Sequence, residues 1–247
     1  MTVIVTGATI SGGVTITGPT IITSGLVLYW DIQNASSYSG SGSTITDLSG
    51  AGNNGTISGA TYASGALTTG TSKYIYTAPS FNLGTGGIGL SWTMTVVSNT
   101  SLTQPQYWSV LWGDEAWSSN GYLAYQSAAN VLVLGSPASS ITYNPALASA
   151  IQGSNTVWDF TYDGTTLNLY KNGVTTPVVS GAVTAIAASS AGIFFGARHV
   201  NGGGASPTDF SATTFYQMRV YNRALSSAEV NANYDVVKTR YPGLGLP

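Results

Sequence analysis

Nine carboxylates are the residues of this chain that could do acid–base chemistry. A carboxylate pair that hydrolyses a glycosidic bond must flank that bond in one cleft, about 5 to 10 Å apart. Asp114 and Glu115 are adjacent, so on a strand their side chains would point to opposite faces of the sheet. Glu229 has the spacing of a helix-capping residue, and Asp163 that of a turn residue. The carboxylates therefore indicate no catalytic pair.

The residue types give little support for a catalytic nucleophile or a zinc site. The chain has one histidine, His199, and no cysteine. A zinc–thiolate site, a pair of histidine ligands and a disulfide are excluded on composition, and no serine forms a recognisable triad motif with His199. Because His199 stands beside the glycine-rich residues 201–204, we expect it in a loop or at a strand end.

A calcium site is more plausible than a zinc site. Asp47, Asn53 and Asn54 lie in a glycine-rich stretch and offer carboxylate and amide oxygens, with Asp31 able to lie nearby. Calcium prefers such oxygen ligands. The same side chains also cap turns by accepting hydrogen bonds from nearby backbone N–H groups. Both interpretations stand, and we favour turn capping.

Sugar binding is the other chemistry that the residue types allow. Aromatic rings stack on the apolar faces of sugars, while Asn and Asp bond to their hydroxyls. Aromatic residues are densest over residues 104–125, and Trp117 falls in the loop expected over residues 113–121. The predicted ligand-binding residues are Trp117, Asp114, Asn120 and Tyr122. The alternative is that Trp117 packs in the core or against a hairpin.

Charge is unusually scarce. Only 6% of the residues are charged, where about 25% is usual, and the formal net charge is -2. With seven basic residues the chain cannot follow a phosphate backbone, so we expect no nucleic acid partner. No run approaches 18 apolar residues, so we expect no membrane span. Charged residues that prevent edge-to-edge strand pairing are also scarce, which favours a subunit of an assembly.

Residues 1–24 differ from the rest, because they contain no charged and no aromatic side chain. Two short apolar runs separated by glycines indicate an extended arm that could add strands to a neighbouring subunit. The alternative is a first strand pair of the main sheet. The segment lacks the basic and apolar regions of a signal peptide. The candidate assembly residues of the arm are Val3, Ile4, Val5, Val14 and Ile16.

The remaining chain alternates in the manner of short strands separated by turns. Residues 26–31 predict a buried strand, and residues 34–65 a long polar loop region. Residues 156–162 and 167–171 predict a hairpin across Asp163-Gly164. The tryptophans within strand patterns are assigned to the core: Trp30, Trp92, Trp108, Trp112 and Trp158.

The end of the chain predicts a strand that runs into a helix. Over residues 213–222, simple alternation places Phe215 on the same face as Arg219, and Tyr216 on the opposite face. Ser226 and Glu229 then have capping-box spacing, and the residues flanking them can form a hydrophobic staple. Roughly a dozen short strands and one short helix predict a double-sheet sandwich.

Four local patterns resemble the laminin-G-like, concanavalin-A-like jelly-roll family. They are the opening strand at residues 25–31, the loop D-x-S-G-x-G-N-x-G at 47–55, the hairpin at 162–173, and the final strand and helix at 215–230. The resemblance implies an all-β jelly-roll sandwich over residues 25–240, an extended N-terminal arm at 1–24 and a loose tail at 241–247. Hydrolases of this fold commonly carry Glu-x-Asp-x-x-Glu on one strand. That pattern is absent here, so we expect no enzyme activity.

The domain, the uncharged arm and the cysteine-free composition together also resemble virion proteins of tailed bacteriophages. This resemblance implies a structural subunit, such as a capsid decoration or a tail-associated protein, assembled in the host cytoplasm and exposed on the particle. Its partners would be other virion proteins or copies of itself. The alternative function is a carbohydrate-binding module that recognises cell-surface glycans, and the two can both hold. We expect no cofactor apart from the calcium ion considered above.

Overall fold

The computed structural model describes residues 20–83, 87, 89–101, 108–113, 123–127, 132–136, 139–143, 153–184, 192–198 and 207–247. Of residues 1–19 it describes only the backbone of β1 (Thr9–Ile10) and β2 (Val14–Thr15), which pair with each other in antiparallel fashion. The side chains of the candidate arm residues Val3, Ile4, Val5, Val14 and Ile16 lie outside the described residues. Their proposed role in assembly stays a prediction.

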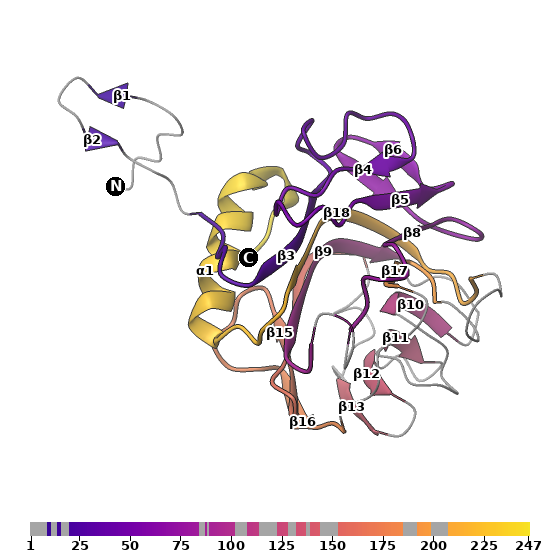
Figure 1. The fold of residues 1–247 in the computed structure, drawn as a ribbon, viewed down its shortest axis with the longest axis vertical. Coiled ribbons are helices and arrows are strands. Elements are labelled where there is room, and N and C mark those ends of the chain that lie inside the picture. Colours follow the sequence, from indigo (N-terminus) through magenta and orange to yellow (C-terminus); the bar gives the residue numbers. More distant parts are fainter. Residues whose placement is uncertain are drawn as a thin grey trace.

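Two eight-stranded antiparallel sheets stack face to face (Figure 1). The back sheet contains β3 (Leu26–Asp31), β6 (Thr61–Ala63), β7 (Ala66–Thr68), β9 (Trp92–Ser101), β14 (Asn155–Tyr162), β15 (Thr166–Lys171), β16 (Val179–Ala182) and β18 (Ala212–Tyr221). The front sheet contains β4 (Thr44–Ile45), β5 (Gly55–Ser58), β8 (Tyr74–Tyr76), β10 (Trp108–Gly113), β11 (Leu123–Ser127), β12 (Leu132–Ser136), β13 (Ser139–Tyr143) and β17 (Phe194–Phe195). The helix α1 (Ser227–Arg240) and the 3-10 turn η2 (Pro242–Leu244) follow β18.

The core lies between the sheets and is rich in aromatic rings. The side chains of Trp30, Trp92, Trp112 and Trp158 are each at most 2% exposed. This confirms the core assignment for these four, while the side chain of Trp108 lies outside the described residues. The expected hairpin is also confirmed, because β14 and β15 pair in antiparallel fashion across Asp163-Gly164.

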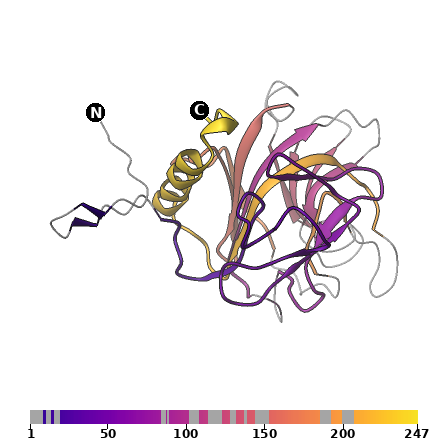
Figure 2. The ribbon, with the colours of Figure 1, turned by 90° about the horizontal axis from the view of Figure 1, so that it is seen from above.

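The helix α1 covers the outer face of the back sheet over its central strands (Figure 2). Val97 of β9 and Val157 of β14 pack against Tyr234 and Val237 of α1. The front sheet lies on the far side of the sandwich from α1. Among the described residues, no helix is both long and apolar enough to cross a membrane.

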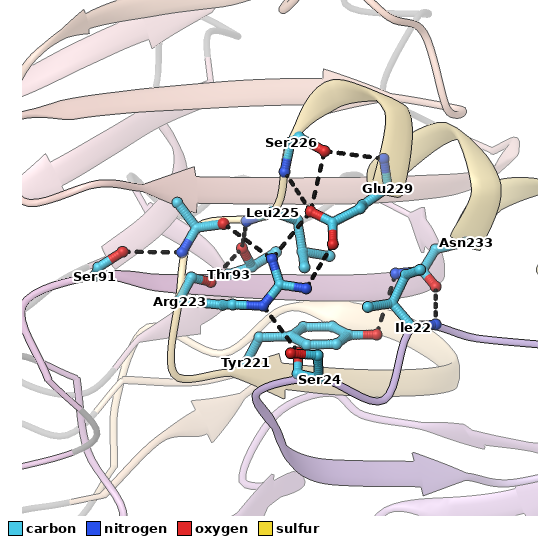
Figure 3. Close-up of polar contacts among 11 residues, drawn as sticks. Ile22, Ser24, Ser91, Thr93, Tyr221, Arg223, Leu225, Ser226, Glu229 and Asn233 are labelled. Atoms are coloured by element: carbon cyan, nitrogen blue, oxygen red, sulfur yellow. Dashed lines mark hydrogen bonds and ion pairs between the residues drawn. The ribbon is translucent and has the colours of Figure 1, made fainter.

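The start of α1 has the expected capping box, shown in Figure 3. The Ser226 hydroxyl accepts a hydrogen bond from Glu229 N, and the Glu229 carboxylate accepts one from Ser226 N. Arg223 adds an ion pair, with Nη2 at 2.6 Å from Glu229 Oε1. That contact is the main reason why the pKa of Glu229 falls to about 2. Leu225 and Val230 lie in one buried cluster, as the staple requires.

The segment that joins the arm to the sandwich is fixed to the same helix (Figure 3). Ile22 N donates to Asn233 Oδ1 at 2.8 Å, and Arg223 Nε donates to the Ser24 carbonyl at 2.9 Å. The Ile22 side chain packs on the cluster of Tyr221 and Leu225. We call Ile22 to Ser24 with these partners the arm root. The described chain therefore belongs to the folded body from at least Ile22.

The predicted alternation of β18 is wrong at one point. A β-bulge between Phe215 and Gln217 shifts the register of β18 against β9. Phe215 consequently lies in the core with Met218, while Tyr216 packs on the helix side. A bulge inserts an extra residue and turns the following side chains over, so strict alternation across residues 213–222 fails.

The expected long polar loop at residues 34–65 is also wrong in part, because it contains β4, β5 and β6. The expected loose tail at residues 241–247 is packed instead. Tyr241 is 2% exposed and Leu246 is 8% exposed. The Asn155 amide donates to the Leu244 carbonyl at 2.8 Å. The tail stays packed because its apolar side chains belong to the hydrophobic cluster between α1 and the back sheet.

A buried polar pair lies on the helix face of the back sheet. Arg219 of β18 and Asp159 of β14 are both 0% exposed. Thr95 Oγ1 donates to Asp159 Oδ1 at 2.5 Å. The three guanidinium nitrogens and Asp159 Oδ2 have no hydrogen-bond partner in the described structure. Burial raises the pKa of Asp159 to about 6, against the opposing effects of Arg219 and Thr95.

The Asp159 carboxyl should give the protein a specific pH dependence. Between pH about 4 and 6 the folded state keeps a proton that the unfolded chain, with an Asp pKa of about 3.9, has lost. The free energy of unfolding should therefore fall by about 2 to 3 kcal/mol as pH rises through this window. Asp159→Asn should remove that fall, as measured by urea unfolding across the window. The exposed Asp235→Asn serves as control, and an unchanged slope in Asp159→Asn would contradict the assignment.

Candidate functional site

The structure brings the three candidate calcium ligands together in one loop. Asp47 Oδ1 accepts hydrogen bonds from Tyr29 N at 2.8 Å and Ser49 N at 2.9 Å. Its Oδ2 accepts from Ser49 Oγ at 2.7 Å and Asn53 N at 2.9 Å. Asn54 Oδ1 in turn accepts from Asp47 N at 2.9 Å. The oxygens that would face a calcium ion are thus directed at N–H and O–H donors.

This loop also covers the free edge of β3. Along β3, residues whose backbone N–H and C=O groups bond to β18 alternate with residues whose backbone groups point away from β18. The outward Tyr29 N bonds to Asp47, and the outward Tyr29 carbonyl accepts from Leu48 N at 2.8 Å. The Val27 carbonyl accepts from Asn53 Nδ2 at 2.6 Å. The loop therefore occupies the position of a neighbouring strand.

The glycine that ends the loop motif has a packing role. Trp30 Nε1 donates to the Asn53 carbonyl at 2.9 Å, which holds the indole against the loop. A Cβ at Gly55 would come within 2.7 Å of the Trp30 ring. The motif D-x-S-G-x-G-N-x-G thus caps an edge strand and seats a core tryptophan. Among the described residues, no group of three or more His, Cys, Asp or Glu side chains could hold a metal ion.

The residues predicted to bind a sugar lie outside the described residues: Trp117, Asp114, Asn120 and Tyr122. The same holds for Glu115 and His199. Their roles stay predictions. Asp159 has the raised pKa of a candidate general acid, but its side chain is fully buried between the back sheet and α1. No substrate atom can reach it there.

A group of aromatic side chains gathers on the outer face of the front sheet. Ile75 of β8 and Phe195 of β17 are 0% exposed and point into the core. Because side chains alternate along a strand, Tyr74, Tyr76 and Phe194 point the opposite way. Phe210 stacks on Tyr74 with ring centroids 6.2 Å apart. We call Tyr74, Tyr76, Phe194 and Phe210 the aromatic platform.

The rings of the platform are in mutual contact. Tyr76 and Phe194 stack with centroids 5.5 Å apart and planes inclined by 11°. Tyr74 lies 5.6 Å from Tyr76 and 5.8 Å from Phe194. Phe194 is 5% exposed and forms the base, whereas Tyr74, Tyr76 and Phe210 are half-buried. Part of each of these three side chains therefore remains accessible from outside.

Hydroxyl groups border the platform. Thr56 and Ser58 of β5 stand opposite Tyr76 and Tyr74 in the register of the front sheet, and cross-strand partners share a face. Within the described part of the chain, the hydroxyls of these four residues make no hydrogen bond. The charges nearest in sequence to Phe210 are compensated, because Asp209 forms an ion pair with Arg198. The platform and its border are therefore made of aromatic rings and hydroxyl groups.

Sequence reasoning missed this platform. The run Tyr74-Ile75-Tyr76 shows two rings on one face of a strand, which is a readable signal. Its meeting with Phe194 depends on the pairing of β17 with β8, between segments far apart in the sequence. Phe210 comes from a third segment. No local pattern contains that register.

Comparison with known proteins supports the fold. No family model matches the chain, and no curated protein sequence does. The binding domain of Paraclostridial Mosquitocidal Protein 1 is similar, with a TM-score of 0.62 and 14% identity over 86% of this chain and 52% of that one. The botulinum neurotoxin serotype D binding domain gives 0.61 and 12% over 87% and 52%. A Trypanosoma rangeli sialidase in complex with the inhibitor DANA gives 0.58 and 16% over 87% and 33%.

These similarities establish the architecture. The chain folds as a jelly-roll β-sandwich with a short C-terminal helix, as the sequence patterns predicted. It spans between 33% and 52% of the length of the similar chains. At 12% to 16% identity the likeness concerns the fold and not the site residues.

The loop geometry predicts the outcome of changing Asp47. Asp47→Ala removes four hydrogen bonds and leaves the half-buried Tyr29 N–H unpaired, so we expect a loss of about 3 kcal/mol in the free energy of unfolding. Asp235→Ala, which removes an exposed carboxylate, is the matched control. Millimolar calcium should leave the thermal midpoint of the unaltered chain unchanged. A midpoint that rises with calcium, and does not rise in Asp47→Ala, would restore the calcium interpretation.

Proposed function

We propose that this chain is a non-catalytic module that binds glycans through its aromatic platform. The platform is the observation that carries the proposal. Its half-buried rings lie on the outer face of the front sheet. That sheet is on the far side of the sandwich from α1 (Figure 2). Aromatic faces stack on the apolar faces of pyranose rings, and surrounding hydroxyls exchange hydrogen bonds with the ring substituents.

The side chains that form and border the platform are themselves neutral, which suits neutral glycans. Tyr74 and Tyr76 carry neutral hydroxyls, and Thr56 and Ser58 supply further donors and acceptors along one side. The Arg198–Asp209 ion pair adds no net charge. Two of the similar structures carry the word binding in their names, which is compatible with a binding role for this fold. The predicted group around Trp117 would add a further ring to such a module.

The proposal predicts the behaviour of a double variant on a glycan array. Tyr74→Ala combined with Tyr76→Ala removes two rings from the outer face and should weaken glycan binding at least about tenfold, or about 1.4 kcal/mol. Tyr62→Ala removes another exposed tyrosine, on the back sheet, and should leave binding unchanged. Trp117→Ala reports whether that predicted residue contributes. An unaltered chain that binds no glycan, or a double variant that binds as well as it, would contradict the proposal.

A second candidate function is a surface subunit of a bacteriophage particle, attached by the N-terminal arm. The arm root favours it. Asn233 and Arg223 hold the backbone of Ile22 and Ser24 against α1, and Ile22 is packed on a buried cluster. A force applied to the arm would therefore be transmitted to the sandwich through this fixed attachment. Under this proposal the subunit assembles in the host cytoplasm with other virion proteins or copies of itself.

The arm root also sharpens the test of this second function. Deletion of residues 1–19 spares Ile22 and Ser24, so the truncated chain should keep its fold and its thermal midpoint. It should fail to enter particles when it replaces the full chain during assembly. Incorporation is measured by the amount of the subunit in purified particles. A folded truncation that enters particles at the normal level would exclude attachment through the arm.

A further inference from the structure

A hollow lies on the opposite face of the sandwich from the platform. It has a volume of about 350 Å³ and sits where the C-terminal end of α1 meets the back sheet. A cavity of a few hundred cubic ångströms is in the size range of small-ligand sites. The side chains that argue for a ligand are Gln33, Ser64, Tyr216 and Arg240.

The β-bulge of β18 places Tyr216 at this hollow. Without the bulge, alternation would put Phe215 on the helix side and Tyr216 toward the core. With it, the Tyr216 ring packs beside the cluster of Val97 and Tyr234 and lines the hollow. Partial burial raises the pKa of Tyr216. Bulges are common next to binding sites, where they re-aim a side chain.

Arg240 is held in place by a buried carboxylate. Its Nη2 lies 2.6 Å from Asp31 Oδ2, and the Asp31 side chain is 0% exposed. The Tyr241 hydroxyl donates to the other oxygen of Asp31 at 2.5 Å. A guanidinium group has five N–H donors, so the contact with Asp31 engages only part of it. The Arg240 side chain is 40% exposed and can donate to a ligand in the hollow.

Three more polar groups line the hollow and are accessible from outside. Among the described residues, the side-chain amide of Gln33 and the hydroxyls of Ser64 and Tyr216 have no hydrogen-bond partner. Gln33 supplies both a donor and an acceptor, and each hydroxyl can act as either. Together with Arg240, these groups come from four separate segments and lie around the Tyr216 ring. Such an arrangement is complementary to a ligand with several hydroxyls.

We propose that this hollow binds one neutral pyranose residue, as a sugar site separate from the platform. Asp31 compensates the charge of Arg240, and the adjacent C-terminal end of α1 carries partial negative charge, so an acidic sugar gains little there. The proposal rests on the proposed function in that the ligand is again a sugar. The two sites lie on opposite outer faces of the sandwich, so one short oligosaccharide cannot occupy both. The module would therefore join two glycan chains.

The test measures binding of single sugars by NMR. The probes are the methyl glycosides of glucose, galactose and N-acetylglucosamine, with methyl glucuronide as the acidic comparison. At least one neutral glycoside should bind in the millimolar range and shift the backbone amides of residues 216, 240, 241, 243 and 244. Tyr216→Ala and Gln33→Ala should each weaken that binding, the former by about tenfold or more. Gln33 is exposed, so its variant tests the site without disturbing packing.

The platform variant separates this inference from the proposed function. Tyr74→Ala with Tyr76→Ala should leave the shifts at residues 216, 240, 241, 243 and 244 intact, even if all binding on the glycan array is lost. The inference is overturned if no neutral glycoside shifts these amides, if only the glucuronide does, or if Tyr216→Ala and Gln33→Ala both bind as the unaltered chain does. Loss of the array signal alone bears on the platform and leaves the hollow supported.

Discussion

Strand β18 hydrogen-bonds to β9 along one edge and to β3 and β7 along the other, and both of its faces are buried. One face presents Met218 and Val220 to the core, and the other presents Arg219 to α1. Helix packing over this strand holds the arm root at the N-terminal end of α1 and the hollow at its C-terminal end. Both features that distinguish the back of the molecule thus depend on how α1 lies across β18.

Scarcity of charge forces the sandwich to protect its strand edges by other means. The outward groups of β3 are bonded by the Asp47 loop. At the opposite side of the sandwich, Ile141 of β13 packs closely on Gly181 of β16. A Cβ added to Gly181 would come within 2.5 Å of the Ile141 side chain. The chain itself therefore covers these edges. The prediction that scarce edge charges favour an assembly stays a prediction.

The two outer faces of the sandwich suit different tasks. The back carries the arm root and the polar hollow, and the front carries the aromatic platform. A module held through its arm would present the platform away from its attachment (Figure 2). The proposed roles in assembly and in glycan binding are therefore compatible in space, because neither needs the surface that the other uses.

The sequence by itself determined the elements whose signals are local. Alternation predicted the strand at residues 26–31 and the hairpin across Asp163-Gly164, and capping-box spacing predicted the start of α1, because each pattern is complete within a few residues. Only the tertiary structure decided the bulge at Tyr216, the packing of the tail and the meeting of Tyr74 with Phe194 and Phe210. These depend on register and burial between segments distant in the sequence. Such contacts form only when the sheets are assembled, so no local pattern contains them.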